Sequence, residues 1–358
     1  FINQRIKFIM AYTTINKSGE HFNTKLFNGT GSTLNVTGIG FQPDLVWNKA
    51  RSGANVNDHR LIDAVRGATK NIYSNSNYYE ETDANGLTSF DSDGFTLGNS
   101  NGMNNGSTAY ASWNWKANGA GVANTDGSIN STVSANTTSG FSIVKYTGTG
   151  SNATVGHGLG VAPSMIIFKR LVGSGWNWTV YHKSIGNNYF MSLNLTNAKS
   201  NTSSSTYFQD TTPTSSVFSI GDSGHLNGDD IIAYCFAEKQ GYSKFGKYSA
   251  VGNVDGNFIY LGFKPSFFLA KRVTDGTEPW IMFDNKRNPF NGVDKNLKPN
   301  LSEAEATQNP PSMDFLSNGI KFRNLDGTFS NAAGKEFIYM AFAEAPLVGT
   351  NNVPCTAR

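Results

Sequence analysis

The sequence predicts an all-β protein made of three tandem β-sandwich modules, of the jelly-roll or concanavalin-like kind, with very little helix. Three observations lead to this prediction. One pattern occurs three times, at residues 40–49, 160–169 and 262–271: a glycine, a proline, a short apolar run, and a lysine six residues after the proline. Short strand-like segments with alternating large residues are joined by turns rich in glycine and asparagine. No segment shows a convincing helical period.

The repeated pattern is typical of a buried strand. Proline cannot donate a hydrogen bond to a sheet, so it is tolerated only near the start of a strand. The apolar residues that follow it are too few for an ordinary helix and are largely β-branched or aromatic. The lysine would then mark the return of the chain to solvent. A short buried helix is the alternative interpretation.

The spacing of the repeats predicts the domain organisation. The prolines lie 120 and 102 residues apart, which is the size of a small domain. We expect an N-terminal arm over residues 1–20 and modules over residues 21–125, 126–241 and 242–358. The arm has no counterpart in the repeat and is a candidate docking segment. Met10 is an alternative start, which would make residues 1–9 a leader or a neighbouring sequence.

Composition excludes several classes of protein. The chain has 358 residues and a formal net charge of only +3, without a dense basic cluster, which argues against nucleic-acid binding. No apolar run approaches the length of a membrane span. The two cysteines, Cys235 and Cys355, cannot form a disulfide framework for three modules, so folding in a reducing cytoplasm is expected.

The sequence offers no catalytic, metal or cofactor motif. Asp63, His182 and Asp284 end equivalent strands, but their alternation between carboxylate and imidazole favours a solvated strand end over a general acid or base. No two histidines have metal-ligand spacing. The segment 91–94 resembles the start of a calcium loop but lacks the later ligands, so a turn is expected. We therefore predict a protein that is not an enzyme, has no cofactor, and shares packing but no reactive group between its modules.

The aromatic residues fall into two groups. Trp47, Trp115, Trp178 and Trp280 lie in core-type strands and are assigned to packing. A second set lies in loops among small polar residues, where exposed aromatic rings stack on sugars or contact partner proteins. These candidate recognition residues are Tyr78, Tyr79, Trp176 and Tyr189. Residues 302–306 predict one short helix, because Ser302 and Glu305 form a capping-box pattern.

Several strings resemble a repeat domain of unknown function that is common in tailed bacteriophages, particularly marine ones. They cover nearly the whole chain after residue 20. The strings are residues 41–47, 58–67, 90–95, 113–117, 233–238, 241–246, 341–346 and 356–358.

The resemblance implies a virion structural protein, usually a tail fibre or tail-associated protein, and it brings no catalytic residues. We expect a homo-oligomeric appendage that is assembled in the host cytoplasm and presents loops to the host surface. Its expected partners are other virion proteins, copies of itself, and a host glycan or protein, with no nucleic acid and no membrane insertion. A capsid decoration or head-fibre protein is the first alternative. A secreted protein that binds or degrades polysaccharides is the second.

Overall fold

The computed structural model describes residues 12–53, 56–173, 175–201, 206–326, 332–349 and 353–355. Within these ranges the structure is built from strands, with one four-residue helix, α1 (Gly224–Asn227), and one 3-10 turn, η1 (Ser18–Glu20). The predicted all-β class is confirmed. Residues 1–9, for which an alternative start was considered, lie outside the described residues.

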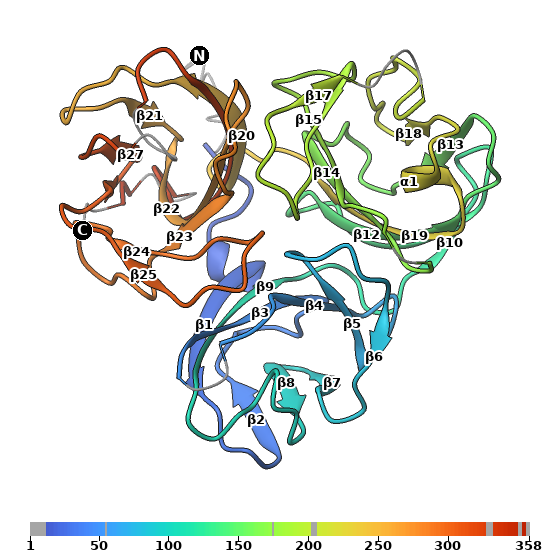
Figure 1. Cartoon of the computed structure of the whole chain (residues 1–358), viewed down its shortest axis with the longest axis horizontal. Coiled ribbons are helices and arrows are strands. Elements are labelled where there is room, and N and C mark those ends of the chain that lie inside the picture. The colour runs from blue at the N-terminus through green and yellow to red at the C-terminus, as the bar shows by residue number, and fades with distance from the viewer. Residues whose placement is uncertain are drawn as a thin grey trace, which may run out of the picture.

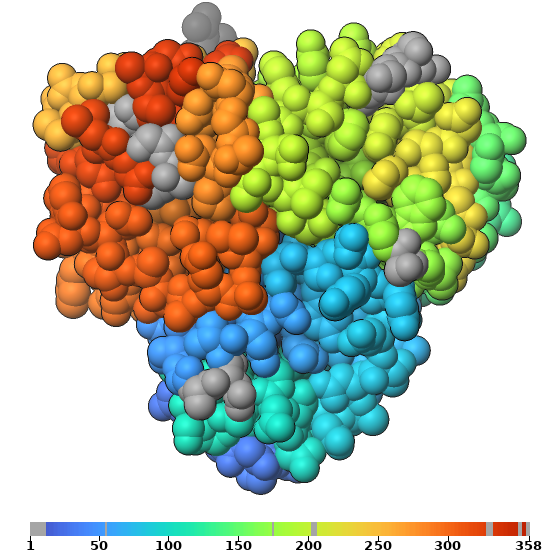
Figure 2. Space-filling view, in the orientation of Figure 1, coloured from blue at the N-terminus to red at the C-terminus, as the bar shows by residue number. Residues whose placement is uncertain are grey.

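Three large antiparallel sheets form three lobes around a common centre (Figure 1). Each sheet is made from one continuous stretch of chain, which we call lobe 1 (residues 22–115), lobe 2 (residues 122–236) and lobe 3 (residues 243–346). Figure 2 shows each lobe in contact with both of the others. A smaller sheet covers the outer face of each large one, which gives every lobe two layers.

Lobe 1 has a large sheet of order β1-β9-β3-β4-β5-β6 and a small sheet of order β2-β8-β7. Its strands are β1 (Phe22–Asn28), β2 (Leu34–Thr37), β3 (Leu45–Ser52), β4 (Arg60–Asp63), β5 (Lys70–Tyr73), β6 (Glu81–Thr82), β7 (Leu87–Asp91), β8 (Gly94–Leu97) and β9 (Ala109–Trp115).

Lobe 2 has a large sheet of order β10-β11-β12-β19-β14-β15, with β13-β18 and β16-β17 as small sheets. Its strands are β10 (Val122–Asn124), β11 (Ser131–Asn136), β12 (Phe141–Thr147), β13 (Ala153–Gly156), β14 (Met165–Arg170), β15 (Thr179–His182), β16 (Tyr189–Phe190), β17 (Ser200–Asn201), β18 (Val217–Ile220) and β19 (Asp230–Phe236).

Lobe 3 has a large sheet of order β20-β28-β22-β23, with β21-β27-β26 and β24-β25 as small sheets. Its strands are β20 (Ser243–Ser249), β21 (Phe258–Tyr260), β22 (Phe263–Arg272), β23 (Ile281–Asp284), β24 (Lys295–Asn296), β25 (Ala306–Thr307), β26 (Met313–Leu316), β27 (Gly319–Phe322) and β28 (Glu336–Pro346).

The three copies of the repeated stretch occupy the same place in their sheets. They form β3, β14 and β22, and each pairs with the strand that closes its lobe, β9, β19 or β28. The register is also the same, because Leu45 faces Trp115, Met165 faces Phe236, and Phe267 faces Phe342. The lobes can therefore be compared residue by residue.

One hydrophobic core is shared by all three lobes. Side chains alternate between the faces of a strand, so Leu45 and Trp47 of β3 enter the shared core while Val46 enters a separate core beneath the small sheet of lobe 1. Lobes 2 and 3 have equivalent outer cores of their own. The shared core therefore contains residues from all three predicted modules. The division of the chain at residues 125 and 241 remains a prediction.

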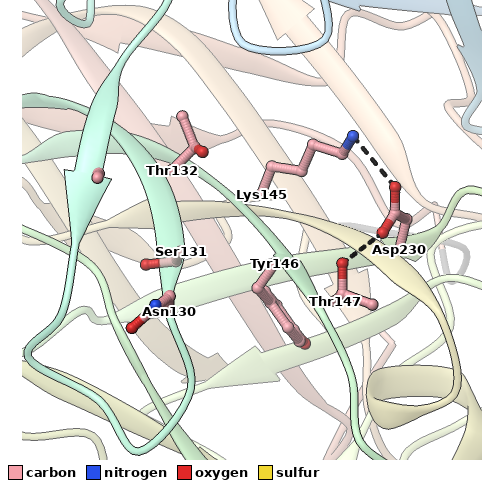
Figure 3. A pocket seen from close by; sticks show the side chains of 8 residues that line it. Asn130, Ser131, Thr132, Lys145, Tyr146, Thr147 and Asp230 are labelled. Atoms are coloured by element: carbon pink, nitrogen blue, oxygen red, sulfur yellow. Dashed lines mark hydrogen bonds and ion pairs between the residues drawn. The ribbon is translucent and has the colours of Figure 1, made fainter.

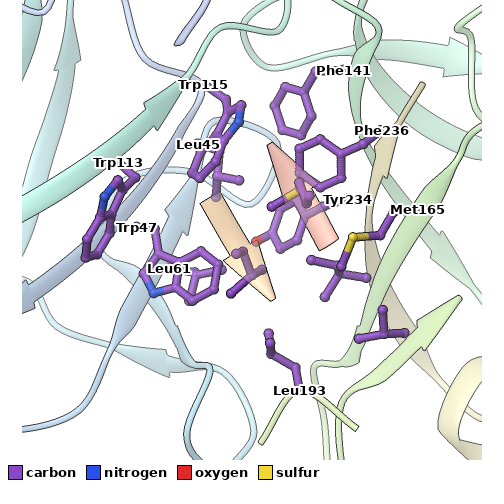
Figure 4. Close-up of a cluster of buried hydrophobic side chains, with 14 of the residues drawn as sticks. Leu45, Trp47, Leu61, Trp113, Trp115, Phe141, Met165, Leu193, Tyr234 and Phe236 are labelled. Atoms are coloured by element: carbon purple, nitrogen blue, oxygen red, sulfur yellow. The ribbon is translucent and has the colours of Figure 1, made fainter. Parts of the chain in front are cut away.

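Trp115 lies where the lobes meet (Figure 4) and is only 1% exposed. Its ring packs against aromatic rings from all three lobes, at centroid distances between 4.9 and 6.4 Å. These neighbours are Phe22 of lobe 1, Phe141 and Phe236 of lobe 2, and Phe267 and Phe342 of lobe 3. The assignment of Trp47, Trp115, Trp178 and Trp280 to packing is confirmed, since all four are buried.

The described part of the N-terminal arm lies against lobe 3 and the joint before it. The Tyr12 hydroxyl donates to the Gly262 carbonyl at 2.7 Å, and the Thr13 hydroxyl donates to the Gln240 carbonyl at 2.8 Å. Ile15 enters the shared core. These contacts tie residues 12–15 to the body of the protein.

Candidate functional site: the junctions between lobes

The lysine of the repeat does not return to solvent, as the sequence analysis expected. Lys49, Lys169 and Lys271 are at most 1% exposed, because the neighbouring lobe covers the end of each strand. Each ammonium group donates to one carbonyl of its own lobe and one of an adjacent lobe. The cross-lobe acceptors are the Ser302 carbonyl for Lys49 (3.1 Å), the Asn77 carbonyl for Lys169 (3.2 Å) and the Thr196 carbonyl for Lys271 (3.0 Å).

A backbone hydrogen bond accompanies each lysine contact. Its donor is the amide three residues after the cross-lobe acceptor, and its acceptor is the carbonyl two residues after the lysine. The three bonds run from Glu80 to Leu171 (2.9 Å), from Lys199 to Val273 (3.2 Å) and from Glu305 to Arg51 (2.9 Å). Three four-residue segments, which we call junction loops, are thus held at both ends by the adjacent lobe. They are residues 77–80, 196–199 and 302–305.

The helix predicted at residues 302–306 does not form. The Ser302 carbonyl accepts from Lys49 and the Glu305 amide donates to Arg51, so the backbone groups that would begin a helix are engaged by lobe 1. The Glu305 carboxylate forms a two-pronged ion pair with the Arg51 guanidinium at 2.9 Å. Contacts with another lobe therefore override the local capping pattern.

The prediction of solvated strand ends at Asp63, His182 and Asp284 is also wrong, because all three are fully buried. Each side chain contacts the closing strand of the next lobe. Asp63 accepts from the Tyr234 hydroxyl at 2.8 Å, Asp284 accepts from the Trp113 indole at 3.1 Å, and the His182 Nε2 atom lies 3.1 Å from the Tyr339 carbonyl. The residue type matches the partner: the carboxylates accept from a hydroxyl or an indole N–H, and the imidazole donates to a carbonyl.

An arginine three residues later accompanies the carboxylate but not the imidazole. Arg66 pairs with Asp63 at 2.6 Å and Arg287 pairs with Asp284 at 2.5 Å, and these four side chains are at most 1% exposed. Lobe 2 has Ile185 at the equivalent position. This pair was not predicted, although the three-residue spacing from aspartate to arginine is visible in two of the three repeats.

The buried lysines are an ionisable group that recurs in all three lobes, contrary to the expectation that the modules share no reactive group. Burial lowers the pKa of Lys49 and Lys169 to about 8 and that of Lys271 to about 7. Their hydrogen bonds to backbone carbonyls give them a structural role, which is to connect one lobe to another.

The burial of the histidines leads us to expect that acid lowers the free energy of unfolding. The His182 Nε2 atom must carry a hydrogen, because it faces a carbonyl, and Nδ1 accepts from the Ser184 amide at 3.1 Å, so the ring is held neutral. Burial lowers the pKa of His182 to about 4, against an ordinary value of 6.5. Burial also lowers the pKa of His21, His59, His157 and His225.

Because the unfolded chain binds protons at these histidines first, the free energy of unfolding should be fully present above pH 6.5 and should fall towards pH 4. His182 alone contributes up to about 3 kcal/mol to this loss. Urea titrations at a series of pH values measure it. H182Q retains a donor for the Tyr339 carbonyl but cannot titrate, so it should reduce the loss. A variant with an unchanged pH dependence would contradict this assignment.

The structure separates the four predicted recognition residues. Tyr78 and Tyr79 are 56% and 48% exposed and form the middle of junction loop 77–80. Trp176 is partly buried, with the Arg170 guanidinium 4.4 Å above its ring and His225 at its edge. Tyr189 is also partly buried, with the Lys199 ammonium 4.6 Å from its ring centre. Of these four residues, only the two adjacent tyrosines are classed as exposed.

A groove with a mixed polar and apolar lining lies beside Tyr79 at the junction of lobes 1 and 2. It consists of two adjoining hollows of about 310 and 420 Å³ that share Lys145 and Asp230. Figure 3 shows the smaller hollow, with Lys145 and Asp230 pointing toward each other. Tyr79 and Glu80 of lobe 1 line the larger hollow together with residues 171–173 of lobe 2. The smaller one is lined by Ala123, Asn130, Ser131, Thr132, Tyr146 and Thr147.

The charges in this groove balance. The Lys145 ammonium pairs with Asp230 at 3.1 Å, and both side chains are more than a third exposed. A hydrogen bond of 2.6 Å from the Thr147 hydroxyl, together with the Lys145 charge, holds the pKa of Asp230 below its usual value. Glu80 is paired with Arg66 and Lys70. The groove offers both donors and acceptors without a large net charge.

Within the described ranges, His, Cys, Asp and Glu side chains do not gather into a group that could hold a metal ion. None of the helices that the structure describes has the length and apolar character to span a bilayer.

One family model, described as a domain of unknown function (DUF7483), matches residues 17–346. No curated protein and no solved structure matches the chain.

Proposed function

The chain belongs to the DUF7483 family, a domain of unknown function, and from this starting point we propose that it is a structural protein of a tailed-phage virion. In this proposal it is a tail fibre or another tail-associated appendage that attaches the particle to the host surface. It acts by binding, without catalysis or a cofactor, and its partners are other virion proteins, copies of itself and a host-surface glycan or protein.

The observation that supports attachment is the presentation of Tyr78 and Tyr79. Exposed tyrosines are effective recognition residues because they bury a large amphipathic surface and lose little conformational entropy. Their loop is held at Asn77 by Lys169 and at Glu80 by Leu171, so the backbone beneath the two rings is fixed before a ligand arrives. A fixed loop on a repeated framework suits a receptor-binding surface.

A second candidate, a capsid decoration protein, is favoured by the equivalence of the three junctions. All three repeat the lysine-to-carbonyl contact and the backbone bond beside it, so a single chain approximates a three-fold arrangement. Such a body would fit a three-fold position on a capsid lattice, because the symmetry of a partner constrains the surface that meets it.

Immunogold electron microscopy of purified particles distinguishes the two candidates. Antibodies against the folded chain should label the tail or its appendages if the protein serves attachment. Labels spread over the capsid would favour the second candidate. Particles that carry no label in either place would contradict the virion proposal.

A further inference from the structure

We propose that the groove between lobes 1 and 2 binds a neutral saccharide, with Tyr79 as the stacking platform and the Lys145–Asp230 pair as the hydrogen-bonding centre. This inference names the ligand class of the attachment function proposed above and therefore rests on it. It goes beyond that function because it assigns one site, one ligand chemistry and separate roles to three side chains.

The internal repeat provides the first reason. The junction loops 77–80 and 196–199 are held in the same way, by a buried lysine at one end and a backbone bond at the other. The middle of the first loop is Tyr78-Tyr79, whereas the middle of the second is Asn197-Ala198. Since the loop is held without any contribution from these rings, the fold does not require tyrosine there. Both rings are exposed, and Tyr79 lines the groove, so they are placed to contact a ligand.

The ion pair provides the second reason. Lys145 pairs with Asp230 at 3.1 Å, and both side chains line the two hollows. An ammonium has three N–H donors, and a carboxylate has lone pairs for about four bonds. Contacts with each other and with Thr147 leave donors on Lys145 and acceptors on Asp230 for a ligand.

The chemistry of the groove selects the class of ligand. Sugar hydroxyls both donate and accept, so they match a paired lysine and carboxylate and the nearby Asn130 and Thr132 side chains. The face of a pyranose ring is apolar enough to stack on tyrosine. A polyanion would need an excess of positive charge, which the balanced groove does not provide. The combined volume also suits one or two sugar rings.

Isothermal titration calorimetry with the full chain tests the assignment. The probes are neutral gluco-, galacto- and manno-oligosaccharides, each compared with a uronic-acid oligosaccharide of equal length. We expect binding of at least one neutral series and weaker binding of the acidic ones. Y79A should raise the Kd about tenfold, and D230N should raise it to a similar degree. A198S, at the matching loop of the next junction, should leave the Kd unchanged.

Two results would overturn the inference: no binding of any neutral series, or binding that Y79A and D230N leave unchanged. Circular dichroism spectra that match those of the parent chain show that the variants fold. Saccharide binding by a chain that is absent from labelled virions would contradict the proposed function and leave the groove assignment intact. Labelled virions together with no saccharide binding would contradict the groove assignment and leave the proposed function intact.

Discussion

Replacing Trp115 by alanine should lower the free energy of unfolding by about 3–5 kcal/mol. The expected loss is large because the indole fills the point where the three lobes meet and contacts five aromatic rings drawn from all of them. Its removal would leave a cavity that no single lobe can close by moving its own strands. Equilibrium unfolding in urea, followed by fluorescence and by circular dichroism, measures the effect.

F290A is the matched control for W115A. It also truncates an aromatic side chain, but Phe290 is 76% exposed, so its loss should change stability by less than about 0.5 kcal/mol. A W115A variant that is as stable as F290A would show that the aromatic core does not hold the lobes together.

Replacing Arg287 by methionine should cost about 3–5 kcal/mol, because it leaves the Asp284 carboxylate buried without its counter-charge. Both side chains are fully buried, and the carboxylate then keeps hydrogen bonds from two backbone amides and the Trp113 indole but loses its ion pair. The site connects lobe 3 to lobe 1, so the loss should also weaken that junction. Urea titration of the purified variant gives the magnitude.

The double variant D284N/R287M separates charge from packing at this site. D284N/R287M has no buried charge left without a partner, so it should be more stable than R287M by at least about 1 kcal/mol. K286A changes an exposed lysine in the same turn and should have little effect. If R287M and K286A cost the same, the buried pair does not stabilise the junction.

The layout of each lobe was predictable because it depends on local patterns. Proline followed by a short apolar run marked β3, β14 and β22, and the alternation of aromatic residues marked the closing strands β9, β19 and β28. Strand alternation determines which side chains lie on the same face, as at Val46 and Trp47. Tyr78 and Tyr79 were found for a similar local reason, since loop composition alone suggested their exposure.

The junctions were not predictable by the same means. Lys49 looks like the polar end of a strand until residue 302, more than two hundred positions away, is known to lie over it. Asp63 and Asp284 were misjudged because their partners, Tyr234 and Trp113, belong to other lobes. Burial of this kind depends on how lobes pack, and a short sequence window does not contain that information. The groove was missed for the same reason, because lobes 1 and 2 both contribute to it.

Differential scanning calorimetry of the whole chain most directly tests the claim that the three lobes share one core and fold as one unit. The shared core and the three hydrogen-bonded junctions predict a single endotherm whose calorimetric and van't Hoff enthalpies agree. Two or three separate endotherms, each assignable to one lobe, would contradict the claim, because lobes that melt independently do not depend on a common core.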